Sequence, residues 1–257
     1  MTDMSPPTLA DLSAMSAEAL AARLVEPGGD RAALIRIAAE GGVAQAQLLL
    51  GQMLLDGIEL PADPRAAFGW FNRAAAQHDM FALNMVGRCY ELGWGVAVDF
   101  TRAAECYRVA AEQGLAEAQY NLATRLALGE GVAQDRGAAL DWFRKAARDP
   151  GLIGAKAANY IGSFHEDGWA VKPDRAAALR HYRTAAEGGD FRGAFNLARL
   201  LAEDGERDEA LAWLGKVREA ATPAFLLKAA DFLGQSTDEH WRAAALAALL
   251  DKKEPTC

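Results

Sequence analysis

The chain has 257 residues, and 51% of them are hydrophobic, which is enough to bury the core of one or two domains. It carries 27 Lys and Arg against 35 Asp and Glu, which gives a formal net charge of −8. Proteins that bind nucleic acid need a basic surface, and no cluster of Lys or Arg occurs in this chain. We therefore expect no nucleic-acid partner.

Residues 1–30 are expected to form an amino-terminal tail and a capping helix near residues 16–26, closed by a proline and two glycines. They contain neither the cationic start nor the apolar segment of a secretory signal, and no run of about 18 apolar residues occurs, so no membrane insertion is expected. The cysteines Cys89, Cys106 and Cys257 are odd in number and irregularly spaced, unlike a disulfide framework. These features predict a cytoplasmic protein.

Residues 31–220 repeat with a fixed period. Similar segments begin at residues 38, 74, 110 and 185 and read AAEGGVAQAQLLLG, AAAQHDMFALNMVG, AAEQGLAEAQYNLA and AAEGGDFRGAFNLA. The starts are 36, 36 and 75 residues apart, and the intervening copy, which begins at Ala146, carries a three-residue insertion. A period of this length predicts a stack of supersecondary units.

Each unit contains two stretches whose apolar residues recur at the three- and four-residue spacing of a helix, for example residues 64–77 and 81–92. The loop between two helices begins with a glycine and ends with an aspartate. These residues can satisfy the free carbonyls and amides at helix ends. The glycines are Gly57, Gly93, Gly129 and Gly168, and the aspartates are Asp63, Asp99, Asp135 and Asp174. Each unit is therefore expected to be helix, tight loop, helix.

One position in the middle of a helix is always small. It is Gly51, Gly87 and Gly162 in three units and Ala123 and Ala198 in two others. An interior glycine costs a helix roughly 0.5–1 kcal/mol relative to alanine, so its repeated use predicts that packed helices approach closely at this position.

The carboxyl-terminal part, residues 221–251, is expected to be a capping pair of helices, and residues 252–257 a mobile tail. The second capping helix is opened by Ser236, Thr237, Asp238 and Glu239 and is expected to run to about Asp251. Outer units that depart from the repeat are expected in a solenoid, because they close its apolar ends.

With these features the chain resembles the Sel1-like repeat family, a relative of the tetratricopeptide repeat. The resemblance is strongest in residues 111–135 and 174–201 and covers roughly residues 31–219. It implies an all-α fold, namely a right-handed α-solenoid of about five helix pairs with degenerate capping helices at both ends. It also implies a concave groove that contacts proteins, and it implies no catalytic activity.

The related tetratricopeptide fold implies which helix lines the groove, and the register of that helix then gives the candidate partner-binding residues. They are Asn84, Arg88, Tyr120, Asn121, Thr124, Asn159, Tyr160, Ser163, Phe195, Asn196 and Arg199, together with the loop residues Trp94 and Trp169. Asparagine pairs with a peptide backbone, aromatic rings supply contact area and arginine binds carboxylates, so the set suits a protein or peptide partner.

Two alternatives stay open for parts of this set. Asn121 and Asn196 could instead join neighbouring repeats through side-chain to backbone hydrogen bonds. The two loop tryptophans could anchor a partner, or each could fold back over the neighbouring helix pair. Leu48, Leu49 and Met85 occupy related positions and are interpreted as structural.

No arrangement of residues indicates catalysis, a metal or a cofactor. His165, Glu166 and Asp167 are the one local cluster of metal-ligand types, but adjacent residues on a helix point in different directions. No phosphate-binding loop, nucleophile elbow or Cys-x-x-Cys pair occurs, and Cys106 lies at a packing register. We expect a protein that is not an enzyme.

The sequence therefore predicts an adaptor that holds a protein partner and leaves its oligomeric state open. A competing interpretation is an accessory subunit that modulates an enzyme. Some short bacterial relatives resemble companions of iron-uptake receptors and of iron- and 2-oxoglutarate-dependent hydroxylases, although no residue of this chain identifies such a partner. A hidden hydrolase or metal enzyme is disfavoured.

Overall fold

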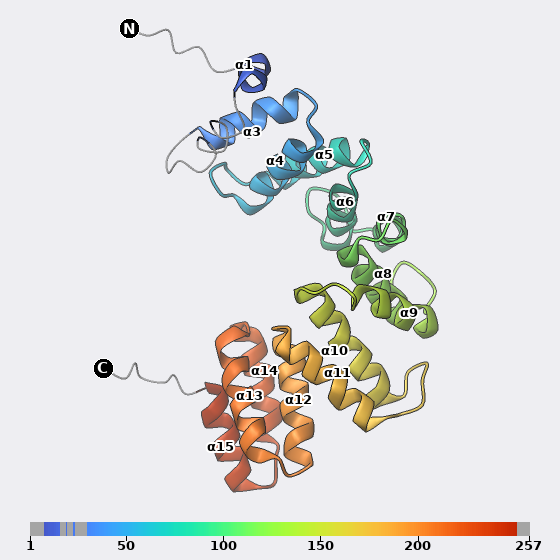
Figure 1. The fold of residues 1–257 in the computed structure, drawn as a ribbon, viewed down its shortest axis with the longest axis vertical. Helices are drawn as coiled ribbons and strands as arrows, with labels where there is room; N and C mark the ends of the chain where they lie inside the picture. Colours follow the sequence, from blue (N-terminus) through green and yellow to red (C-terminus); the bar gives the residue numbers. More distant parts are fainter. Residues whose placement is uncertain (1–7, 16–18, 20–22, 24–29, 251–257) are drawn as a thin grey trace, which may run out of the picture. The chain divides into compact units, whose positions relative to one another are not determined.

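All regular structure in the described part of the chain is α-helical (Figure 1). The computed structural model describes residues 8–15, 19, 23 and 30–250. Apart from Ala19 and Arg23, the expected helix near residues 16–26 lies outside the described residues, as does the tail 252–257. The helices are α1 (Leu9–Ala14), α3 (Arg31–Glu40), α4 (Ala44–Asp56), α5 (Pro64–Ala75), α6 (Met80–Leu92), α7 (Phe100–Glu112), α8 (Ala116–Leu128), α9 (Arg136–Ala146), α10 (Leu152–Asp167), α11 (Arg175–Glu187), α12 (Phe191–Glu203), α13 (Arg207–Ala220), α14 (Pro223–Gly234) and α15 (Glu239–Leu250).

The helices from α4 onward alternate between two roles. We call α4, α6, α8, α10, α12 and α14 the A helices, and α5, α7, α9, α11, α13 and α15 the B helices. The A helices α4, α6, α10, α12 and α14 each pack against the B helix that follows. Four of the expected five helix pairs, α4 with α5, α6 with α7, α10 with α11 and α12 with α13, are packed within one unit, and α14 with α15 forms a further pair.

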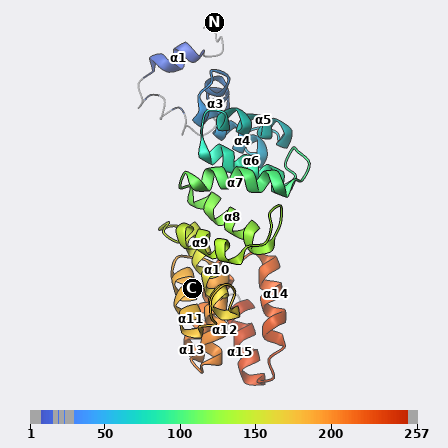
Figure 2. The same ribbon diagram turned by 90° about the vertical axis from the view of Figure 1, so that its right-hand side faces the viewer.

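Contacts between helices divide the chain into two compact units. Unit one comprises residues 1–125 and 129–133, and unit two comprises residues 126–128 and 134–257, so the division runs through α8. In unit two, α13 packs against both α12 and α15 (Figure 1 and Figure 2). The division of the chain at residues 30, 220 and 251 that the sequence suggests stays a prediction.

The loop residues end and begin helices as expected. Gly57, Gly93, Gly129 and Gly168 each follow an A helix in the left-handed conformation, with φ between 69° and 76°. Asp63, Asp99, Asp135 and Asp174 each precede a B helix, and a side-chain oxygen accepts a hydrogen bond from the amide three residues later. Because both kinds of cap satisfy otherwise unpaired backbone groups, the positions of these glycines and aspartates in the sequence are sufficient to place the loops.

The small position of the A helices is where aromatic side chains of the B helices pack. A Cβ atom added to Gly51, Gly87 or Gly162 would lie 2.6 Å from an aromatic carbon. These carbons belong to Phe71, Tyr107 and Tyr182, which occupy the equivalent position of three B helices and are almost fully buried. The close approach that the repeated glycine predicts is therefore confirmed, because each ring lies against the helix backbone.

Replacing Ala123 with leucine tests the same packing in the repeat that carries alanine. Ala123 is fully buried, so we expect the larger side chain to lower the free energy of unfolding by about 1–3 kcal/mol through overpacking. Urea unfolding followed by circular dichroism measures the change. The exposed Ala247 of α15 is the control, and its change to leucine should leave the transition where it is. Equal transitions for both variants would contradict the placement of Ala123.

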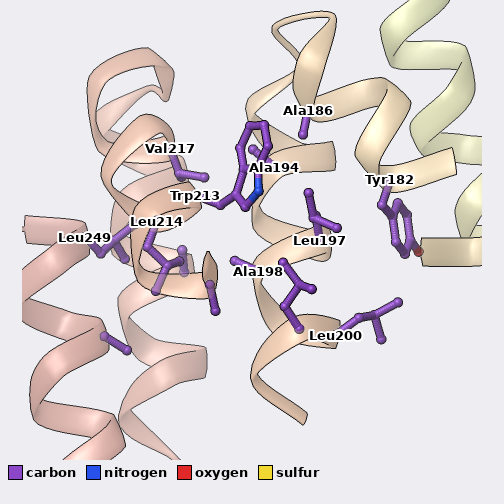
Figure 3. Packing of buried hydrophobic residues seen from close by; sticks show 14 of the residues in the cluster. Tyr182, Ala186, Ala194, Leu197, Ala198, Leu200, Trp213, Leu214, Val217 and Leu249 are labelled. Carbon is purple, nitrogen blue, oxygen red and sulfur yellow. The ribbon is translucent and has the colours of Figure 1, made fainter. Parts of the chain in front are cut away.

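Leucine-rich layers form the core of unit two. Leu197 and Leu200 of α12 are fully buried with Leu214 and Val217 of α13, and Leu249 of α15 joins the same cluster (Figure 3). Burying a side chain of this kind stabilises a fold by roughly 1.5–3 kcal/mol. The buried face of α12 is thus packed against α13, and this packing holds the opposite face of α12 in one position.

Candidate partner-binding surface

The candidate residues chosen by register lie on four A helices. Asn84 and Arg88 lie on α6, Tyr120, Asn121 and Thr124 on α8, Asn159, Tyr160 and Ser163 on α10, and Phe195, Asn196 and Arg199 on α12. Asn84 and Asn159 are buried, whereas the others are half-buried. Unit one thus holds the set on α6 and α8, and unit two holds the set on α10 and α12.

Pairs of asparagines join neighbouring A helices within each unit. The Nδ2 of Asn121 donates a hydrogen bond to Oδ1 of Asn84 at 2.9 Å, and Nδ2 of Asn196 donates to Oδ1 of Asn159 at 2.9 Å. The structural alternative assigned these asparagines side-chain to backbone bonds. Neighbouring repeats are indeed joined, but each bond runs between two amide side chains. Asn84 and Asn159 are cut off from water, so each needs such a partner. The asparagines therefore hold the repeats in register.

Arg199 belongs to an ion pair on the same surface. Its Nη2 lies 2.6 Å from both carboxylate oxygens of Glu166, and the hydroxyl of Tyr182 donates to Glu166 Oε2 at 2.7 Å. Burial opposes the charge of Arg199, but Glu166 outweighs this and raises the pKa of the guanidinium above its ordinary value. Burial also raises the pKa of Tyr182. Arg199 is thus a cation whose position is fixed and whose charge is already paired with that of Glu166.

Unit one repeats the tyrosine–glutamate contact. The hydroxyl of Tyr107 donates to Oε2 of Glu91 at 2.5 Å, and Nη2 of Arg125 lies 3.4 Å from Glu91 Oε1. Tyr107 and Glu91 stand 75 residues before Tyr182 and Glu166, at the same register. This contact was not predicted from the sequence, although Tyr and Glu recur at a fixed spacing in the repeat.

The two loop tryptophans fold back onto their own unit. The guanidinium of Arg88 lies 4.9 Å from the ring centroid of Trp94. Trp169 packs edge to face on Phe164 at 5.6 Å, and the guanidinium of Arg136 lies 4.5 Å from its centroid. The geometry supports the structural alternative for both rings, because each is held between a cation or a second ring and the helix pair.

His165 and His181 form a stacked pair between α10 and α11. Their ring centroids are 5.5 Å apart with 11° between the planes, and Nδ1 of His165 is buried without a hydrogen-bond partner. Burial lowers the pKa of His181, and His165, Arg180 and Arg144 lower it further. In the described residues no group of three or more His, Cys, Asp and Glu side chains could hold a metal ion.

The histidine pair predicts a loss of stability in acid. Because the pKa of His181 is lowered in the folded chain, the unfolded chain binds the proton more readily, and stability should fall as the pH drops below about 6.5. Tryptophan stands at the equivalent position in other B helices, as Trp142 and Trp213, so His181→Trp should fit and should flatten this slope. Urea unfolding between pH 7.5 and pH 5 measures it, and the exposed His240→Gln is the control. Identical slopes for both variants would contradict the role of His181.

A cavity of about 360 Å³ opens beside Arg199 in unit two. Its wall includes Arg199, Glu203, Arg207, Phe232, Asp238 and Trp241, which come from α12 to α15 and the last loop. Of the candidate residues, Arg199 alone is among those that line it. The cavity was not predicted from the sequence, because its lining residues come from four helices and the loop between α14 and α15 and form no motif.

Comparison with protein families identifies the repeat. Sel1 repeats match residues 44–79, 81–115, 116–149 and 155–190, which together make up more than half of the chain. A curated protein of Rattus norvegicus, DAP3-binding cell death enhancer 1, is 34% identical over 100 residues. That match covers 38% of this chain and 19% of the rat protein, so the chain corresponds to a small part of that relative.

Two solved structures have the same arrangement of helices. The Escherichia coli protective antigen c5321, described as having an SLR fold, is 29% identical with a TM-score of 0.67, over 85% of this chain and 48% of c5321. A Sel1 repeat protein of Oxalobacter formigenes is 24% identical with a TM-score of 0.67, over 86% of this chain and 88% of that protein. The expected fold class, an α-solenoid of helix pairs, is confirmed.

Proposed function

Since the chain belongs to the Sel1 repeat family, we propose that it is a non-enzymatic adaptor that binds a protein or peptide partner along its A helices. Sel1 repeat proteins generally mediate contacts between proteins, and the family is not typically enzymatic. The name of the rat relative likewise describes a protein that binds another protein. A cytoplasmic location fits this role. No described helix is both long and apolar enough to cross a membrane.

The preorganised side chains of the A helices carry this proposal. The asparagine pairs and the Arg199–Glu166 ion pair fix the polar groups before a partner arrives. A surface that is already ordered loses little conformational entropy on binding. Within unit one the proposed contact set is Arg88, Tyr120, Asn121 and Thr124, and within unit two it is Tyr160, Ser163, Phe195, Asn196 and Arg199. Asn84 and Asn159 position these sets through their hydrogen bonds to Asn121 and Asn196.

Charge-matched variants test the proposal. Arg88, Tyr120 and Arg199 are changed together to alanine, and proteins that co-purify stoichiometrically with the unaltered chain are then titrated against the variant. We expect binding to weaken about tenfold or more, because aromatic and arginine side chains carry most of the energy of an interface. Changing Arg108 and Arg180, two exposed arginines of B helices, to alanine removes the same number of positive charges. This variant is the matched control and should leave affinity unchanged.

Unaltered affinity in the A-helix variant would contradict the proposal. An enzyme that co-purifies and changes its turnover on binding would favour the accessory-subunit alternative, which uses the same surface for a narrower purpose. An iron-uptake-linked hydroxylase is one such partner, and it is recognised by iron- and 2-oxoglutarate-dependent turnover in the complex.

A further inference from the structure

The cavity of unit two lies where the last loop between an A and a B helix is short. Residues 168–174 connect α10 to α11, whereas only residues 235–238 connect α14 to α15. The longer loop carries a tryptophan directly after its first glycine, and the shorter loop carries none. The last loop is thus three residues shorter than residues 168–174 and supplies no such ring; the loop of residues 204–206 between α12 and α13 is also short and carries no tryptophan.

In the α10–α11 pair that tryptophan has a defined seat. Trp169 packs edge to face on Phe164, at 5.6 Å, and lies beneath the guanidinium of Arg136, at 4.5 Å. Phe164 follows the small residue of α10 by two positions and is fully buried. Arg136 is the first residue of the preceding B helix, α9. The seat is therefore made by one A helix and by the start of the B helix before it.

Both walls of this seat recur at the cavity. Phe232 follows Ala230, which has the small position of α14, by two residues, and Arg207 is the first residue of the preceding B helix, α13. Both line the cavity. Phe232 is 49% exposed, whereas Phe164 is fully buried. Phe232 thus presents exposed ring surface to the cavity, and it also packs edge to face on Phe195 at 5.8 Å.

The charges of the cavity wall are already paired. Nη2 of Arg207 lies 2.6 Å from Asp238 Oδ2, and its guanidinium lies 5.7 Å from the ring of Trp241. Arg199 is paired with Glu166 at 2.6 Å. A charged guest would have to break one of these pairs, whereas an uncharged ring gains the aromatic and cationic contacts without this cost.

We propose that the cavity is a binding site for an aromatic side chain, best an indole, of the partner protein. The ring lies between Phe232 and Arg207, as Trp169 lies between Phe164 and Arg136. This inference rests on the proposed adaptor function and adds to it a specificity, namely a partner segment that presents an exposed tryptophan, tyrosine or phenylalanine to unit two.

Titration with blocked amino acids tests the site on the full chain. The probes are N-acetyl-tryptophanamide, N-acetyl-leucinamide and N-acetyl-lysinamide, and the signal is the indole Nε1–H of Trp241 in ¹⁵N-resolved NMR spectra. We expect a saturable shift with the tryptophan probe at about 1–10 mM, as befits a single side chain, and binding of the leucine probe at least about threefold weaker. The lysine probe should cause no saturable shift.

Two pairs of variants separate this seat from general hydrophobic binding. Phe232→Ser should weaken binding of the tryptophan probe about fivefold, the contribution of one aromatic pair. Phe81→Ser, at a somewhat more exposed ring of unit one, should not change it. Replacing residues 235–238 with the chain's own loop GWAVKPD should fill the seat from within and abolish binding. The same graft with alanine in place of its tryptophan should restore it.

Several outcomes would overturn the inference. These are no shift of Trp241, equal binding of the leucine probe, and full binding by Phe232→Ser. A shift of Trp241 on raising the protein concentration alone would mean that a second copy supplies the ring, which contradicts a partner's side chain. Such failures would leave the adaptor role intact if the A-helix variant still loses its partner. Loss of the adaptor role would show instead in unchanged partner affinity of that variant.

Discussion

Changing Gly131 to alanine is expected to lower the free energy of unfolding by about 2–4 kcal/mol. Gly131 has a φ of +74°, and a Cβ atom at this position would lie 2.1 Å from the carbonyl oxygen of Phe100. The obstacle is the backbone at the start of α7, which cannot move aside as a side chain could. The loop would therefore have to withdraw from α7, and the contact of two successive repeats in unit one would be lost.

Ala170 provides the matched control. It stands in the loop position equivalent to Gly131 and has a φ of +60°, but it already carries a Cβ atom. Ala170→Gly should therefore change stability by less than about 1 kcal/mol. Glycine relieves the strain of a left-handed alanine, but it also raises the conformational entropy of the unfolded chain. Urea unfolding by circular dichroism compares the two. A Gly131→Ala variant as stable as the unaltered chain would contradict the close approach.

The second large effect is expected for Trp169. Replacing it with alanine removes an indole that contacts Phe164 and Arg136 and should cost about 2–4 kcal/mol, somewhat below the value for a fully buried tryptophan because this one is half-buried. Phenylalanine keeps a ring in the seat and should restore about half of the loss.

Equilibrium unfolding of the two Trp169 variants gives the comparison, with fluorescence of the remaining tryptophans as the signal. A loss of less than about 0.5 kcal/mol for alanine would show a loosely held ring, as is usual for surface changes. That result would also remove the basis on which the cavity beside Phe232 is assigned an aromatic guest, because the occupied and the empty seat are compared through Trp169.

Local rules explain why so much of the helix arrangement is predictable from the sequence. A glycine in the left-handed conformation and an aspartate that caps the next helix are each specified by a few neighbouring atoms, so Gly129 and Asp135 place their loop without knowledge of the rest. The small position was predictable for a different reason. It repeats with the period of the structure, and a glycine within a helix needs a packing explanation, which Tyr107 supplies for Gly87.

The chemistry of the candidate surface was less predictable. Register places Asn121 and Arg199 on the A helices but does not say which groups they bind. Asn121 pairs with Asn84 and Arg199 pairs with Glu166, and both partners lie on the adjacent A helix rather than on their own. Such contacts depend on the offset between two helices, which a single repeat does not encode. They turn several candidate contacts into groups that hold the surface in place.

The cavity was unpredictable because it is lined by residues from four helices and a short loop that share no motif. A motif is recognised by the residues that are present. The last loop differs from residues 168–174 by three residues that it lacks, and such an absence forms no motif. Phe232 looks like an ordinary core residue in the sequence, because its equivalent Phe164 is buried. Comparing loop lengths between repeats, together with the register of the exposed ring, would have indicated the site.

Photo-crosslinking of the chain to its partner is the most direct test of the A-helix surface. A benzophenone side chain is placed at Tyr120 or Phe195 on the A helices, and in separate variants at Arg108 or Arg180 on the B helices. The proposed adaptor function predicts covalent capture of the partner from the two A-helix positions and none from the two B-helix positions. Capture from the B-helix positions alone would contradict it.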